Sequence, residues 1–127
     1  IGNMNKGSAL YFECQQNQLP TLAFLLPEKD APRDVNIPVE LVIKVDNRDV
    51  IRGDGIIQRR NDHYVHTYAD NLDLFQVLKD IRDAQQKILV GYQIKGTNAN
   101  DSFSGSVRKS TASVNQFIKA CNLNLSQ

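Results

Sequence analysis

Residues 37–46 read Ile-Pro-Val-Glu-Leu-Val-Ile-Lys-Val-Asp, and their hydrophobicity alternates along most of the segment. Every second position is aliphatic: Val39, Leu41, Ile43 and Val45. Glu40 and Lys44 occupy positions between them, where Val42 is the one apolar residue. Because successive side chains of a β-strand point to opposite faces of its sheet, this period of two predicts a strand that is buried on one side.

Segments on both sides of this one predict further strands. They are short and lie close together in the sequence: 9–15, 21–26, 49–52, 55–60, 63–68, 88–94 and 102–109. Gly53-Asp54 and Arg60-Asn61-Asp62 are predicted turns between strands, and residues 27–35 are a predicted proline-rich, charged loop. Short strands at this spacing are typical of antiparallel sheets and sandwiches.

Two segments have a helical period instead. The first covers residues 71–86, with Asp70 or Asn71 as its cap. Its apolar stripe consists of Leu74, Phe75, Leu78 and Ile81. The second begins near Ser110 or Thr111. Its apolar face consists of Val114, Phe117, Ile118 and Cys121. Side chains at this spacing share one face of a helix, so both helices are expected to pack against the sheet, with Cys121 pointing into the core.

The two cysteines lie near opposite ends of the chain. Neither belongs to a CxxC pair or is flanked by histidine, which argues against zinc binding and thiol redox chemistry. Two interpretations remain, namely two free thiols in a cytosolic protein or a Cys14–Cys121 disulfide. We favour the disulfide, which would close a loop of roughly 100 residues and stabilise the fold by about 4–5 kcal/mol. A disulfide in turn implies an oxidising compartment, so we expect a periplasmic or secreted protein.

Together these elements predict an α+β fold that is mostly β. We expect an antiparallel β-sandwich of about seven to eight strands with two packed α-helices. Residues 1–8 are predicted to be a flexible N-terminal leader, and residues 9–127 to be a single disulfide-linked, β-sandwich-like domain. The chain begins with Ile1 rather than methionine, which we interpret as processing or trimming.

Composition and motifs argue against several classes of function. The 15 basic and 14 acidic residues leave a net charge of +1, which gives no reason to expect nucleic acid. No apolar run approaches the roughly 18–20 residues of a membrane span. His63 and His66 lie on opposite faces of a predicted strand and cannot chelate one metal ion together. Without a phosphate-binding loop or a nucleophile motif, we expect no catalysis and no cofactor.

One cluster of side chains is a candidate binding surface for a partner. Its members lie on or beside the predicted turns of the central strands: Arg48, Arg52, Arg59, Arg60, His63 and Tyr64. The alternative is a solvated rim, because aspartates are interspersed with the arginines. Arg52-Gly53-Asp54 also spells an integrin-recognition tripeptide, and Asn100-Asp101-Ser102 and Asn124-Leu125-Ser126 fit the N-glycosylation pattern, although sequences this short arise readily by chance.

The layout of the chain resembles small exported bacterial proteins of the type VI secretion-associated accessory and invasion-associated locus B families. The matching elements are an early strand ending in cysteine, a strand ending in aspartate, a helix after a short hairpin, and a closing helix with cysteine. They correspond to Leu10 to Cys14, Val39 to Asp46, Asn71 to Gln86, and Phe103-Ser104-Gly105-Ser106 followed by Ser113 to Cys121. The resemblance implies a periplasmic or secreted β-sandwich with a structural disulfide that acts through protein contacts.

These observations lead to a ranked set of functional hypotheses. The first is a non-catalytic exported protein-binding domain, either an accessory of a secretion or envelope system or a virulence factor. The second is a periplasmic inhibitor or immunity protein that blocks a toxin or a cell-wall hydrolase with the loop at 27–36 or 96–101. The third is a small hydrolase whose active site has no recognised motif.

Overall fold

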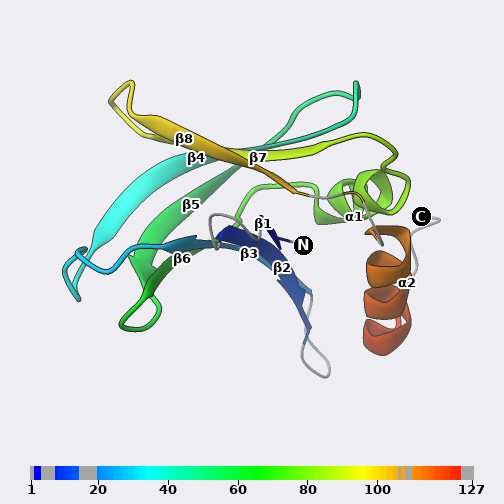
Figure 1. Ribbon diagram of the computed structural model, residues 1–127, viewed down its shortest axis with the longest axis horizontal. Helices are drawn as coiled ribbons and strands as arrows, with labels where there is room; N and C mark the ends of the chain where they lie inside the picture. Colours follow the sequence, from blue (N-terminus) through cyan, green and yellow to red (C-terminus); the bar gives the residue numbers. More distant parts are fainter. Residues whose placement is uncertain (1, 4–7, 15–19, 106, 108–109, 124–127) are drawn as a thin grey trace.

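The structure is a computed structural model that describes residues 2–3, 8–14, 20–105, 107 and 110–123. Figure 1 shows the arrangement of its strands and helices. In chain order they are β1 (Gly2–Asn3), β2 (Ser8–Glu13), β3 (Thr21–Pro27), β4 (Asn36–Val45), β5 (Ile51–Arg59), β6 (Tyr64–Tyr68), α1 (Leu74–Arg82), β7 (Ile88–Ile94), β8 (Asn100–Gly105) and α2 (Ser110–Cys121). Within the predicted leader, residues 2–3 pair with β2 as a short strand, and residues 1 and 4–7 lie outside the described residues.

All eight strands belong to one antiparallel sheet in the order β1-β2-β3-β6-β5-β4-β7-β8. The sheet curls so that β7 and β8 lie over β2 and β3 (Figure 1). The mostly-β, antiparallel fold with two helices is therefore confirmed, whereas a closed two-layer sandwich is not. The physical reason is that every strand bonds to the next in one series: β4 bonds to both β5 and β7, and β5 bonds to β6, so twist curves a single sheet instead of separating two.

The predicted turn at Gly53-Asp54 is wrong, because both residues continue β5. Gly53 lies so close to the chain after β6 that an added Cβ would be 2.8 Å from the Asp70 carbonyl oxygen. A glycine in this strand therefore marks close backbone packing, although glycine is also the usual residue of a turn.

The core fills the concave side of the sheet. The four aliphatic residues predicted to be buried in β4 are at most 1% exposed, and Val42 is half-buried on the other side. Helix α1 covers one end of the curl through Val77, Leu78 and Ile81. The helix starts later than predicted because the side chain of Asp73, rather than Asp70 or Asn71, accepts the hydrogen bond from the Gln76 N–H at 3.1 Å. As a result Phe75 is exposed and Val77 takes its place in the core.

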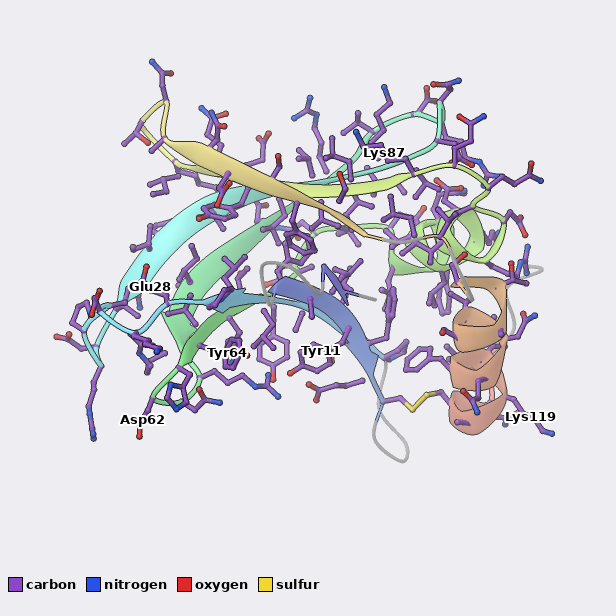
Figure 2. The ribbon with its side chains drawn as sticks, viewed as in Figure 1. Tyr11, Glu28, Asp62, Tyr64, Lys87 and Lys119 are labelled. Carbon is purple, nitrogen blue, oxygen red and sulfur yellow. A yellow bond between two sulfur atoms is a disulfide. The ribbon has the colours of Figure 1, made fainter. Side chains whose placement is uncertain are left out.

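Helix α2 packs against α1, and a ring contact and a disulfide join it to β2 and the residue after it. Ser110 and Val114 are its buried residues, and the Phe117 ring packs 5.5 Å from that of Phe12 on β2. The Cys14–Cys121 disulfide joins the end of α2 to the residue that follows β2 (Figure 2). Both cysteines are half-buried, so Cys121 lies at the edge of the core and not within it as predicted. The bond links positions 107 residues apart.

The carboxylate of Asp46 fixes the segment that connects α1 to β7. Asp46 accepts hydrogen bonds from the backbone N–H groups of Lys87, Gln85 and Gln86 at 2.9, 3.0 and 2.8 Å. These bonds favour the ionised form and hold the pKa of Asp46 below its ordinary value of 3.8. Asp46 itself has a positive φ of 54°, a conformation that aspartate and asparagine tolerate better than most residues.

Replacing both cysteines, Cys14→Ser with Cys121→Ser, should release the end of α2 and lower the free energy of unfolding by about 4–5 kcal/mol. We expect the amides of α2 to lose protection from hydrogen exchange before those of β4 and β7. Exchange measured by mass spectrometry checks this order, and unchanged protection of α2 in the double variant would contradict the attachment described above.

Asp46→Asn should lower the melting temperature at pH 7, since the neutral amide is a weaker acceptor for the three N–H groups. Because the folded-state pKa is depressed, this stabilisation is complete above pH 3.8 and is lost as the pH falls through the lowered value. The difference in melting temperature should therefore shrink in acid. Asp49→Asn is the control, since Asp49 is exposed nearby. An equal effect of both variants would contradict the role of the Asp46 carboxylate in fixing residues 85–87.

Candidate binding site

Aromatic side chains gather on the convex side of β2 and β6, opposite the core. We call this surface the outer aromatic face and define it by Tyr11, Tyr64, His66 and Tyr68. Strand alternation explains the orientation, because their neighbours Leu10, Val65 and Thr67 are buried on the concave side. Figure 2 shows Tyr11 and Tyr64 on the same side of the sheet, facing away from β7 and β8.

Register in the sheet brings these residues together. Ala23 of β3 lies directly between Tyr11 and Tyr68, and Leu25 pairs with His66. A small side chain on β3 thus separates two tyrosines on the strands at either side of it, β2 and β6. The result is a continuous surface across β2, β3 and β6 in which apolar and aromatic groups predominate on a sheet face that normally carries polar residues.

Arg60 joins this surface from the end of β5. Its guanidinium lies 4.9 Å from the centre of the Tyr11 ring, and its Nη1 is 3.5 Å from His66 Nδ1. The His66 and Tyr68 rings are 5.0 Å apart. Burial, together with the nearby Arg60 charge, lowers the pKa of His66, while Glu13 opposes the shift. The guanidinium of Arg60 supplies a positive charge to the outer aromatic face.

The structure disperses the other predicted arginines. Arg48 pairs with the nearly buried Asp80 of α1 at 3.1 Å, and Arg52 pairs with Glu40 on β4 at 2.7 Å. Arg59 donates to the backbone carbonyls of Glu28 and Ala31 and so fixes the loop after β3. Of the six predicted residues, Arg60 and Tyr64 lie on the outer aromatic face. His63 lies beside Glu28, Lys29 and Asp30 in a cavity of about 500 Å³ that Tyr64 also lines.

A second feature borders the outer aromatic face, a cleft of about 440 Å³ between β5 and β6. It opens where the pairing of these strands is interrupted. Gln58 pairs with His66, and pairing resumes only where Asp54 and Asp70 exchange two backbone hydrogen bonds of 2.8 Å. Ile56 and Tyr68 lie opposite each other at the interruption, and they are 45% and 44% exposed.

Gly55 lies beside the interruption and leaves room there for the side chain of Thr67. A Cβ on Gly55 would lie 2.1 Å from the Oγ1 atom of Thr67, whose side chain is fully buried beside β5. Thr67 directs this hydroxyl to the carbonyl oxygen of Tyr68 at 3.3 Å. A threonine side chain therefore occupies the space at β5 that a glycine leaves empty, and the backbone pairing between the strands gives way at that point.

Polar groups form the rim of the cleft. Asp54 accepts hydrogen bonds from Lys95 Nζ at 2.8 Å and from Asn71 Nδ2 at 3.0 Å, and these contacts lower the pKa of Asp54. Asn71 has a positive φ of 53°, which turns the chain away from β6. Gln58 and Asp70 complete the polar part of the rim.

Sequence reasoning missed Tyr11, His66, Tyr68 and Ile56. The alternation of Tyr64, His66 and Tyr68 with Val65 and Thr67 could have revealed one aromatic face of a strand, whereas the position of Tyr11 beside it depends on the sheet order. The integrin-like tripeptide lies within β5, where Arg52 and Asp54 are both ion-paired. Asn100-Asp101-Ser102 lies in β8, and Asn124-Leu125-Ser126 lies outside the described residues.

Comparisons with models of known protein families, with curated proteins and with solved structures returned no match. Among the described residues, no group of three or more histidine, cysteine, aspartate or glutamate side chains could hold a metal ion. No helix in the described part of the chain is long and apolar enough to cross a membrane.

Proposed function

We propose that the chain is a non-catalytic binding domain that acts in the periplasm or after secretion and docks onto a protein partner through the outer aromatic face. The observation that carries this proposal is the presence of three tyrosines and an arginine on one convex sheet surface. Tyrosine and arginine are enriched at the cores of protein interfaces, where lysine, glutamate and aspartate are depleted.

The disulfide supports the proposed compartment. Disulfides form and persist in oxidising environments and are rare in the reducing cytosol. The resemblance to exported accessory and invasion-associated proteins points in the same direction. An accessory of a secretion or envelope system, or a virulence factor, is therefore our first candidate role.

An inhibitor or immunity protein is the second candidate, and a particular contact favours it. The guanidinium of Arg59 bonds two carbonyls of the loop between β3 and β4 and so preorganises residues 28–31. A rigid protruding loop loses little conformational entropy when it enters the cleft of an enzyme, which is what tight inhibition requires.

Site-specific photo-crosslinking in the organism of origin separates the two surfaces. We expect Tyr64→benzoylphenylalanine to give one discrete protein adduct, and Lys44→benzoylphenylalanine, on the outer side of β4, to give none. With the partner purified, Arg60→Ala should weaken binding at least about tenfold, as expected for an anchor near the centre of an interface. An adduct from position 30 but not from position 64 would favour the inhibitor. Equal labelling from positions 44 and 64, or wild-type affinity of the Arg60 variant, would contradict docking through the outer aromatic face.

A further inference from the structure

Backbone groups at the cleft between β5 and β6 lack the partners that a sheet normally supplies. In an antiparallel ladder, the bonded pairs Asp54–Asp70 and Gln58–His66 should be joined by a third bonded pair between them, Ile56 and Tyr68. That exchange is missing, although all of these residues are described. The Tyr68 carbonyl accepts the Thr67 hydroxyl instead. The N–H and C=O of Ile56 and the N–H of Tyr68 are left to hydrogen-bond water or a ligand.

The free backbone groups at this opening can bind one amide group, but they are too few to bind an extended peptide. A peptide that adds to a sheet uses a run of alternate backbone donors and acceptors along a free strand edge. Here the ladder is closed again on both sides, at Asp54 and at Gln58. A single acetamido group has one N–H and one C=O, and it can engage the open backbone groups without requiring a longer slot.

The side chains around the opening can contact the ring and the hydroxyl groups of a sugar that carries the acetamido group. Tyr68 and Ile56 expose apolar surface where the C–H face of a pyranose ring and a methyl group can pack. Beside them, Asp54 is an acceptor that already holds Lys95 and Asn71 in place as donors. A hydroxyl group both donates and accepts, so it can bridge a carboxylate and an ammonium or amide group.

The charge and the volume of the cleft restrict the class of ligand further. Two carboxylates, Asp54 and Asp70, and one ammonium group, Lys95, border the cleft, and this balance disfavours an anion. The volume of about 440 Å³ lies in the range of roughly 300–1,000 Å³ that is typical of small-ligand sites. We propose that this cleft binds an uncharged oligosaccharide that contains 2-acetamido sugar units, with the acetamido group at Ile56 and Tyr68.

The test is an NMR titration of the intact, ¹⁵N-labelled protein with tetra-N-acetylchitotetraose, and with cellotetraose as the matched sugar without acetamido groups. We expect saturable shifts of the Ile56, Tyr68 and Asn71 amides with the acetylated sugar, and affinity for cellotetraose at least about tenfold weaker. Tyr68→Ala should reduce the affinity for the acetylated sugar at least about tenfold. Tyr64→Ala, on the same strand and the same face but outside the cleft, should leave it unchanged.

Asn71→Gly is a second variant, which removes a polar contact at the cleft. Glycine adopts the positive φ of position 71 readily, so we expect this variant to fold even if the Tyr68 variant does not. It should also weaken binding. No shift at about 10 mM sugar, equal affinity for cellotetraose, or equal affinity for acetyl-trialanine amide would overturn the proposal. Because Tyr64 serves the protein partner and not the sugar, failure of one proposal leaves the other standing.

Discussion

The close approach of Gly55 and Thr67 is the contact on which the shape of the outer surface depends. Any side chain at position 55 would collide with the Thr67 hydroxyl, so the absence of a Cβ there allows β6 to bury a polar threonine against β5. Two residues earlier, the absence of a Cβ at Gly53 leaves room for the carbonyl oxygen of Asp70. The ladder is interrupted between the pairs Asp54–Asp70 and Gln58–His66, and Ile56 and Tyr68 are exposed there on the convex side.

The single curled sheet divides the chain into two chemical faces. The concave face contains the aliphatic core, with α1 at one end. On the convex face the aromatic side chains concentrate over β2, β3 and β6, and the polar cleft adjoins them at Tyr68. The two proposals thus concern neighbouring surfaces with different chemistry.

Local patterns in the sequence predicted the elements better than their assembly. The alternation in β4 could be predicted because strand period is a local property. The Cys14–Cys121 disulfide could be predicted because the chain has two cysteines, so one pairing is available. The turn at Gly53-Asp54 was wrong because the same residues serve a close strand contact. The predicted cluster of arginines is dispersed because Arg48 and Arg59 bond to α1 and to the loop after β3, which are far away in sequence. The neighbours of Tyr11 depend on sheet order, which no local pattern encodes.

Residue-resolved hydrogen exchange of the free protein tests the interrupted ladder most directly. The Asp54 and Asp70 amides, which bond each other's carbonyls at 2.8 Å, are the internal reference. We expect the Ile56 and Tyr68 amides to exchange at least about tenfold faster than this pair, because they lack the corresponding bonds. Equal protection of all four amides would mean that β5 and β6 pair continuously, and it would contradict both the cleft and the surface built around it.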